Sequence, residues 1–264
     1  MKKIAILLLA ILTFSCSDDD EKGTEEDKGQ WAMIFNETVK SDSNPVDRTE
    51  KFMFDGERLI QHIIKQRYFE EEISNEVNLS YSDNQVTVTT DYLTLVYTLN
   101  SEGYASQCVY SLSSQNRIYQ FSYSAEGYLT GIVENIDDTE YSSTSLTYEN
   151  GDITSISSKM NGLENKFIYE PGEESSTYHL PCLGLLEIHP LTFHIEALYA
   201  GLLGKDPRHF TMHSCPAGSN DEKTVYSYGF DKKGNPSRMI CQTTYAGGQA
   251  SYYPYTRNIS VSFE

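Results

Sequence analysis

The sequence predicts a mainly β protein, in which successive antiparallel hairpins form a strongly curved or barrel-like sheet that holds one short buried helix. Three observations predict this fold class. Apolar and polar residues alternate with a period of two on both sides of short turns, which is the signal of β-hairpins. Twenty of the aromatic residues are Tyr, which is favoured in half-buried strands. One stretch, residues 179–213, departs from the alternation and carries apolar residues at helical spacing.

The hairpins follow one another along most of the chain, and each has an apolar strand, a polar turn and a second apolar strand. The turns are expected at Gly56, Asn84, Gly103, Gly127, Gly151 and Gly234. Tyr97, Tyr123 and Tyr148 are 26 and 25 residues apart, which is enough chain for one hairpin and its return connection. Such a series forms an antiparallel meander. A long meander has to curl or close, because an open sheet would expose its edge strands.

Residues 179–213 form an irregular insertion in this series. Within it, residues 191–203 are strongly apolar, at a spacing nearer to that of a helix than to that of a strand. Gly204 and Pro207 then form a helix stop signal. We therefore expect one short helix over residues 191–203. Because this segment has few charged positions, we expect it to be buried, as a plug within the curved sheet.

The N-terminus has the three parts of an export signal. Two lysines precede an apolar run over residues 4–12, which is too short to cross a bilayer and matches the hydrophobic region of a signal peptide. Ser15 and Cys16 follow, and they resemble the lipobox of bacterial lipoproteins, in which the mature chain begins at a lipid-modified cysteine. The alternative is an ordinary secretory signal with a chance cysteine. We predict a signal peptide over residues 1–15 and lipid on Cys16.

Residues 16–30 are expected to form a flexible acidic tether, because they contain almost no apolar side chains. Their start, residues 17–21, resembles the signal that sends Bacteroidetes lipoproteins to the outer face of the outer membrane. An acidic tether is repelled by an anionic membrane and would hold the domain away from the lipid. The expected location is therefore the outer membrane, through the lipid anchor and with the domain exposed at the surface. Residues 31–264 are expected to form a single β-rich domain.

The chain is strongly acidic. Removal of residues 1–15 takes away two lysines and no acidic residue, which leaves 18 basic and 38 acidic residues. Binding to nucleic acid depends on Lys and Arg at phosphate groups, so this balance argues against a nucleic-acid partner. Adjacent acids at residues 70–72 and 137–138 are interpreted as solvated surface rather than as the carboxylate pair of a glycosidase.

Four cysteines remain for the domain: Cys108, Cys182, Cys215 and Cys241. An exported protein can form disulfides, and four cysteines allow three pairings. We prefer a bridge between Cys182 and Cys215, because it would staple the irregular insertion. Four buried free thiols are the alternative.

His209, His213 and Cys215 are weak candidates for a metal site. On a strand their side chains would share one face, and imidazole with thiolate is a plausible zinc set. The spacing does not match the metalloprotease helix, since Phe210 stands in place of its glutamate. A cysteine outside the cytoplasm is also more readily oxidised than metallated. We therefore expect no metal and no cofactor.

A cluster of tyrosines near the C-terminus is the best candidate for a ligand-binding surface. It consists of Tyr245, Tyr252, Tyr253 and Tyr255. Aromatic side chains on a curved sheet can stack on sugars or line an apolar pocket. An exposed aromatic patch often marks an interaction site, whereas most of the other tyrosines are expected to pack across strands.

The segment over residues 197–205, together with the lipid tether and the Gly-containing hairpins, resembles a family of uncharacterised Bacteroidetes lipoproteins. That family is described as a domain of unknown function with a porin-like fold. The resemblance covers roughly residues 50–264; it implies a barrel-like fold and brings no established catalytic residues. The hairpins also resemble the tyrosine-rich repeats of YD-type proteins, but without their repeated Tyr-Asp dipeptide.

Two hypotheses for function follow. The first is a non-catalytic binding or scaffold module of the cell envelope, whose ligand is a glycan, a lipid or a partner protein. It rests on a clear fold signal that no catalytic motif accompanies. The alternative is a hydrolase of extracellular glycans or peptides, with a site near residues 179–215.

Overall fold

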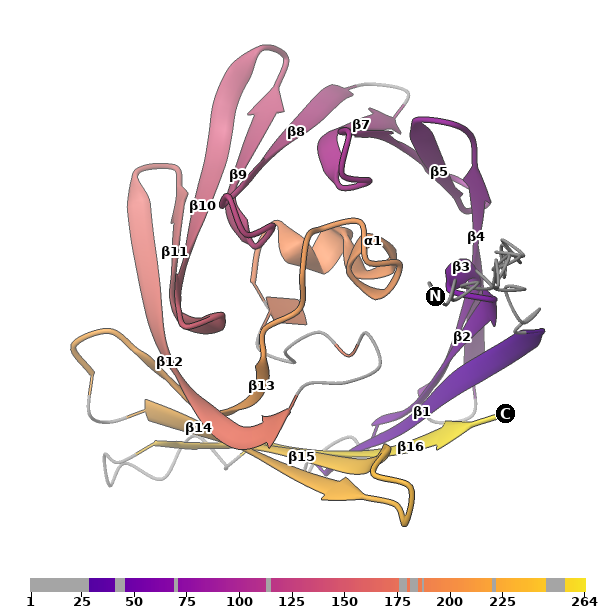
Figure 1. Ribbon diagram of the computed structural model, residues 1–264, viewed down its shortest axis with the longest axis vertical. Coiled ribbons are helices and arrows are strands. Elements are labelled where there is room, and N and C mark those ends of the chain that lie inside the picture. The colour runs from indigo at the N-terminus through magenta and orange to yellow at the C-terminus, as the bar shows by residue number, and fades with distance from the viewer. Residues whose placement is uncertain are drawn as a thin grey trace, which may run out of the picture.

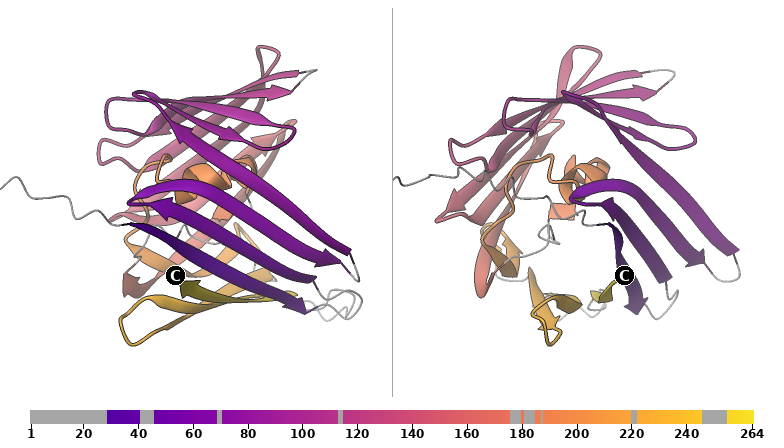
Figure 2. Two further views of the ribbon diagram at one scale, coloured as in Figure 1. Left: turned by 90° about the vertical axis from the view of Figure 1, so that its right-hand side faces the viewer. Right: turned by 45° about the vertical axis from the view of Figure 1, so that its right-hand side comes forward.

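The chain folds into a closed antiparallel barrel of sixteen strands that surrounds a short plug (Figures 1 and 2). The computed structural model describes residues 29–40, 46–68, 71–112, 115–175, 180, 185–186, 188–219, 222–245 and 255–264. Each strand pairs with its neighbours in sequence, and β1 (Gln30–Lys40) pairs with β16 (Tyr255–Phe263) to close the barrel. The predicted hairpin meander is therefore confirmed, and its two edges join.

The remaining strands follow in chain order. They are β2 (Val46–Asp55), β3 (Arg58–Tyr68), β4 (Glu71–Tyr81), β5 (Gln85–Thr89), β6 (Thr94–Leu99), β7 (Ala105–Leu112), β8 (Gln115–Tyr123), β9 (Leu129–Ile136), β10 (Thr139–Glu149), β11 (Asp152–Met160), β12 (Leu163–Ser175), β13 (His209–Pro216), β14 (Glu222–Phe230) and β15 (Pro236–Tyr245). All six turns that the sequence predicts connect adjacent strands.

The connections fall alternately at the two ends of the barrel, because neighbouring strands are antiparallel. We call the end at which β1 begins the proximal end; it carries the six Gly- or Asn-containing turns predicted from the sequence. The last residue, Glu264, is also there, where its amide and carbonyl pair with those of Ala32. The opposite, distal end carries the turns at residues 90–93, 137–138 and 161–162.

The strands direct apolar side chains into the barrel and polar side chains outward. In β4, Val77 and Leu79 are buried, whereas Glu76, Asn78 and Ser80 on the other face are exposed. β10 shows the same alternation between its faces. Transmembrane barrels have the reverse arrangement, with an apolar outer band and a polar interior. In this barrel the inward side chains form a core.

The chain between β12 and β13 runs through the centre of the barrel and completes this core (Figure 1). We call residues 188–208 the plug. It contains the 3-10 helix η2 (Leu191–Phe193) and the helix α1 (Ile195–Tyr199). The described residues between β12 and β13 bury nine apolar side chains. Two precede the plug, Leu180 and Leu185, and seven belong to it: Ile188, Leu191, Ala197, Leu198, Tyr199, Leu202 and Leu203. The predicted burial of the helix inside the sheet is therefore confirmed.

The helix itself is shorter than the predicted range of residues 191–203. His194, with φ −123° and ψ 28°, separates η2 from α1. Gly201 and Gly204 have φ of 69° and 89°, in the left-handed region that ends a helix. The apolar spacing therefore reflects burial on several sides of an irregular chain. The insertion also ends before the predicted boundary, because β13 begins at His209.

No helix within the described ranges is long and apolar enough to cross a membrane.

Backbone hydrogen bonds fix the plug to the proximal turns. They join Ala105 N to Leu202 O (2.7 Å), Lys205 N to Gly127 O (2.9 Å) and Arg208 N to Gly151 O (3.1 Å). Each of the three turns involved is one of those predicted from the sequence. The plug therefore closes against the proximal end, where its backbone satisfies polar groups of the turns.

A methyl group at Gly204 is expected to disrupt this attachment. Its Cβ would lie 2.6 Å from Gly127 O and 3.1 Å from Leu129 N, whereas no atom lies within 4 Å of a Cβ at Gly103. Gly103 also has a left-handed φ, 85° against 89°, and is the matched control. Both changes to Ala carry the cost of a left-handed residue, about 1–2 kcal/mol. We expect Gly204→Ala to cost about 1–3 kcal/mol more through overpacking. Urea denaturation measures both, and equal losses of stability would contradict the close contact.

Candidate functional site

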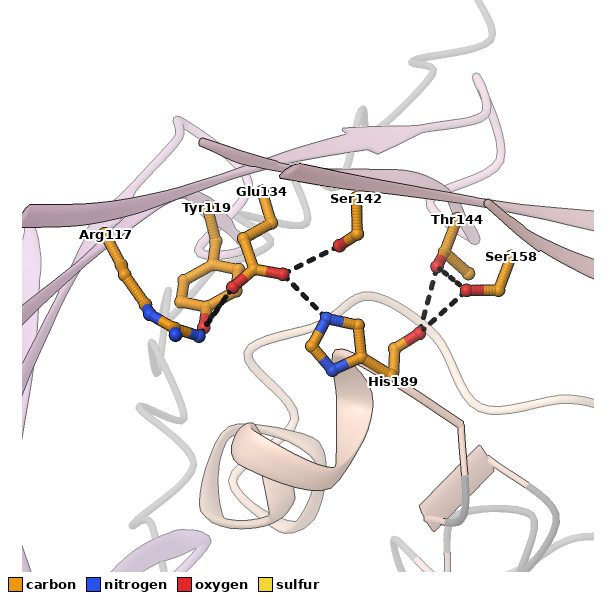
Figure 3. Close-up of polar contacts among 7 residues, drawn as sticks. All are labelled: Arg117, Tyr119, Glu134, Ser142, Thr144, Ser158 and His189. Atoms are coloured by element: carbon orange, nitrogen blue, oxygen red, sulfur yellow. Dashed lines mark hydrogen bonds and ion pairs between the residues drawn. The ribbon is translucent and has the colours of Figure 1, made fainter. Parts of the chain in front are cut away.

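A buried carboxylate, Glu134 on β9, lies at the centre of a polar cluster between the barrel wall and the plug (Figure 3). Its Oε1 atom accepts hydrogen bonds from Arg117 Nη1 (2.9 Å) and from the Tyr119 hydroxyl (3.2 Å). Its Oε2 atom accepts one from the Ser142 hydroxyl (2.7 Å) and lies 2.6 Å from His189 Nε2. A carboxylate has about four acceptor positions. Those of Glu134 are therefore filled by protein donors.

The register of β8, β9 and β10 brings the wall part of this cluster together. Tyr119 pairs with Glu134 across β8 and β9, and Ser142 pairs with Glu134 across β9 and β10. Residues paired in this way point to the same face of the sheet, here the barrel interior. Arg117 lies two residues before Tyr119 and shares that face. Strand alternation therefore places four of the five side chains, and the plug supplies the fifth.

The plug presents His189 to the wall through its backbone as well as its ring. The His189 carbonyl accepts hydrogen bonds from the hydroxyls of Thr144 (3.1 Å) and Ser158 (3.2 Å). These two hydroxyls are 3.1 Å apart and also contact one another (Figure 3). The carbonyl and the ring of His189 are thus both hydrogen-bonded to the barrel wall, which fixes the imidazole against Glu134.

The electrostatics of the cluster keep Glu134 ionised. Burial alone would raise the pKa of this carboxyl, because the charged form loses its hydration. Hydrogen bonds from His189 and Ser142, with electrostatic contributions from His189 and Arg117, outweigh that effect and lower the pKa of Glu134 below its usual value. Glu134 is therefore an anion that holds its neighbours in place.

A hollow of about 680 Å³ opens beside this cluster at the distal end of the barrel. It lies between the tips of the hairpins β9–β10 and β11–β12. Its lining residues are Ile136, Thr139, Glu140, Tyr141, Lys159, Asn161 and Gly162. Small-ligand sites commonly have volumes of about 300–1,000 Å³. We call this hollow the distal pocket; its size fits a small ligand.

Tyr141 connects the distal pocket with the Glu134 cluster. Tyr141 lines the pocket, and the centre of its ring lies 5.8 Å from the Arg117 guanidinium and 6.3 Å from the His189 ring. The register with β9 shifts between Glu140 and Ser142, so Tyr141 occupies a bulge. A bulge turns a side chain away from regular alternation, which allows Tyr141 to contact inward-facing residues although it directly precedes inward-facing Ser142.

Three charged or amide side chains of the distal pocket are not engaged by the protein. Within the described ranges, Glu140, Lys159 and Asn161 form no side-chain hydrogen bond or ion pair. Glu140 and Asn161 are exposed at the two hairpin tips, and Lys159 is exposed on β11. The pocket thus combines an aromatic ring with a carboxylate, an ammonium and an amide that can all bind a ligand.

A second buried cluster joins the plug to β2 and β3. His62 lies between two carboxylates, with Nδ1 2.8 Å from Glu196 Oε1 and Nε2 3.0 Å from Glu50 Oε2. Its ring is 0% exposed and stacks on Phe52 at 4.0 Å. Burial opposes the charged form, but the hydrogen bonds and charges of Glu196 and Glu50 raise the pKa of His62 above its usual value. The imidazole is therefore protonated and donates to both carboxylates.

His194, between these two clusters in the plug, has the opposite protonation behaviour. Its ring is 0% exposed, and its Nδ1 atom is hydrogen-bonded to the Tyr97 hydroxyl (2.8 Å). The ring packs edge-on against Tyr119 at 4.4 Å. Burial lowers the pKa of His194 to about 3, with opposing minor effects from Glu134 and His189. His194 is therefore neutral.

The residues considered as a zinc set bind separate partners. His209 Nδ1 lies 2.9 Å from Asp152 Oδ2, and His213 Nδ1 lies 2.9 Å from Glu170 Oε2. Cys215 is half-buried on β13. Among the residues that the structure describes, no group of three or more His, Cys, Asp or Glu side chains is arranged to hold a metal ion.

Several predicted residues lie outside the described part of the chain. They are residues 1–15, Cys16, Cys182, Tyr252 and Tyr253, and the side chains of Tyr245 and Tyr255 are outside it as well. Cys215 forms no disulfide with another described cysteine. The signal peptide, the lipid, the Cys182–Cys215 bridge and the tyrosine patch stay predictions.

Arg117, Glu134 and Tyr141 are not among the residues that the sequence predicts to be functional. One signal for Glu134 was present: it follows Ile132 at an inward position of an alternating strand, where a carboxylate is unexpected. His189 and His194 belong to the predicted irregular region, and both prove to contact the barrel wall. Tyr141 had no such signal, because its position depends on a bulge.

Comparisons with known proteins agree with this architecture. A family model described as a domain of unknown function (DUF4595) with porin-like fold matches residues 52–238. The crystal structure of a porin-like protein from Bacteroides uniformis is similar with a TM-score of 0.80 and 27% identity, covering 88% of this chain and 96% of that one. A porin-like protein from Bacteroides vulgatus has a TM-score of 0.54 and 11% identity, covering 87% and 97%, and shows the fold alone. No curated protein matches the chain. The chain belongs to the family of domains of unknown function with a porin-like fold.

Proposed function

We propose that this protein is a lipid-anchored module of the cell envelope that binds a ligand at its distal pocket and does not catalyse a reaction. The observation that carries the proposal is the distal pocket itself. It combines an aromatic residue, Tyr141, whose ring contacts Arg117, with polar side chains that form no hydrogen bond or ion pair within the described ranges. Pockets that combine apolar surface with a few convergent polar groups are the usual form of a binding site.

The chemistry of Glu134 favours binding over hydrolysis. A general base or a nucleophile needs an oxygen that can reach the substrate. Both oxygens of Glu134 are occupied by donors from Arg117, Tyr119, Ser142 and His189. The carboxylate is also 0% exposed. Its role is to hold the wall and the plug together behind the pocket.

The topology supports a pocket that faces away from the membrane. The described chain begins at the proximal end, whereas the pocket lies at the distal end, near residues 137–138 and 161–162. Lipid on Cys16 would therefore hold the proximal end toward the membrane, with residues 17–29 as the spacer. A ligand would then reach the pocket from the side away from the bilayer.

A binding screen with the purified mature protein tests the pocket. The probes are a glycan array, lipid vesicles and a peptide library, each with wild type, Tyr141→Ala and Tyr92→Ala. Tyr92 is 70% exposed in a different distal turn and is the matched control. We expect one class of probe to bind and Tyr141→Ala alone to weaken it. Hydrolysis of a probe, or binding that Tyr141→Ala leaves unchanged, would contradict the proposal.

The lipid anchor is tested by Cys16→Ser. We expect wild type to partition into the detergent phase of a Triton X-114 extract and Cys16→Ser to move to the aqueous phase, because an acyl chain supplies about 0.8 kcal/mol for each buried methylene group. Cys215→Ser, which removes a different thiol, should stay with wild type. Detergent-phase recovery of Cys16→Ser equal to that of wild type would exclude lipid on this residue.

A further inference from the structure

The lining of the distal pocket points to one class of ligand. We propose that it binds a saccharide, with the Tyr141 ring as a stacking platform. This inference rests on the proposed function and names the ligand of the same site. It is drawn from the seven lining residues and from the side chains that support Tyr141.

The free polar groups of the pocket match the hydroxyl groups of a sugar. Each hydroxyl both donates and accepts hydrogen bonds, so it is best satisfied by a mixture of donors and acceptors. Glu140 supplies acceptors, Lys159 supplies donors and the Asn161 amide supplies both. None of the three is engaged elsewhere within the described ranges, so a ligand does not have to displace a protein contact.

The aromatic ring matches the other property of a sugar, its apolar C–H faces. An aromatic side chain gains from packing against such a surface while its polar tip stays in water. The Tyr141 ring is held by Arg117 at 5.8 Å and by His189 at 6.3 Å, and both are fixed by Glu134. A ring that is already held loses little conformational freedom when a ligand stacks on it.

The same lining disfavours a lipid or a strongly charged ligand. Ile136 is the single aliphatic side chain among the seven lining residues, so an acyl chain would leave polar groups without partners. Glu140 and Lys159 carry opposite charges, so the pocket has no excess charge of its own that would select an ionised group. An uncharged, hydroxyl-rich ligand is left as the best match.

Titration calorimetry of the mature protein with cellohexaose, xylohexaose, mannohexaose and chitohexaose tests the inference. We expect at least one to bind, and Tyr141→Ala to weaken it by at least about tenfold. Tyr141→Phe keeps the ring and should stay within about threefold of wild type, whereas Glu140→Gln and Lys159→Met should each weaken binding about three- to tenfold. Tyr92→Ala, the exposed distal control, should bind as wild type does.

The outcomes separate the ligand class from the binding function. Tyr141-dependent binding of a vesicle or a peptide, without binding of any of the four sugars, would overturn the saccharide and leave the binding module intact. No binding of any probe class would overturn both proposals. Sugar binding that Tyr141→Ala and Lys159→Met leave unchanged would place the sugar elsewhere and overturn this site. Circular dichroism and a urea midpoint unchanged from wild type confirm that each pocket variant is folded.

Discussion

Glu134→Ala is expected to lower the free energy of unfolding by about 3–5 kcal/mol, the usual cost of removing one partner of a buried ion pair. Four donors lose their acceptor in this variant: Arg117 Nη1, the Tyr119 and Ser142 hydroxyls, and the His189 ring. Arg117 is 24% exposed and regains part of its hydration, which places the expected loss toward the lower end. Urea denaturation of wild type and variant measures the difference.

Two variants control this result. Glu140→Ala removes an exposed carboxylate from β10 that has no protein partner within the described ranges, and it should change stability by less than about 0.5 kcal/mol. Glu134→Gln keeps the shape but turns an amide N–H₂ toward groups that are themselves donors, so its cost should lie between the other two. A loss for Glu134→Ala no larger than that for Glu140→Ala would show that the cluster does not hold the plug to the wall.

The stability of the barrel is expected to be greatest near pH 6.5, because two buried histidines titrate in opposite directions. His194 has a pKa lowered to about 3, mainly by burial. Below pH 6.5 the unfolded chain binds a proton at His194 that the folded chain does not, so stability falls as the pH is lowered. The slope is at most about 1.4 kcal/mol per pH unit, and about 2 kcal/mol is expected between pH 6.5 and 5.

His62 acts on the alkaline side. Burial opposes its charged form, but the contacts with Glu196 and Glu50 raise its pKa above the usual value. Its stabilising effect is fully present below pH 6.5 and is lost as the pH rises through the raised pKa, because the unfolded chain releases this proton first. The expected stability curve therefore falls on both sides of pH 6.5, each side through a different histidine.

Urea denaturation from pH 5 to pH 9 tests both slopes. His194→Asn keeps a polar side chain that can donate to or accept from the Tyr97 hydroxyl but cannot titrate, and it should flatten the acidic side. His62→Gln should flatten the alkaline side. Leu163→Ala, which shortens an exposed side chain that cannot titrate, should leave both slopes in place. An acidic slope that persists in His194→Asn would mean that other groups cause it.

The sequence predicts the hairpins well because their determinants are local. The alternation of side chains and a left-handed glycine such as Gly127 or Gly151 act within a few residues, whatever the rest of the chain does. Burial of the plug was also predictable, since its apolar residues outnumber its charged ones. The length of its helix was not, because His194 and Gly201 interrupt an apolar spacing that alone resembles a helix.

The site depended on contacts between distant parts of the chain. His189 is 55 residues from Glu134 in the sequence, and the two side chains meet because the plug lies inside the barrel next to β9. Where β1 pairs with β16 to close the barrel, the Arg257 side chain donates a hydrogen bond to Glu37, which is 220 residues away in the sequence. No local pattern specifies which strands meet across such separations, since many partners would satisfy the same alternation.

By itself, the sequence determined the β-hairpins and the buried insertion, because these follow from short-range periodicity, turn residues and composition. Closure of the barrel and the placement of Glu134, His189 and Tyr141 were decided by the tertiary structure. Register across strands and a bulge in β10 set which side chains meet, and both become fixed when the whole barrel has formed.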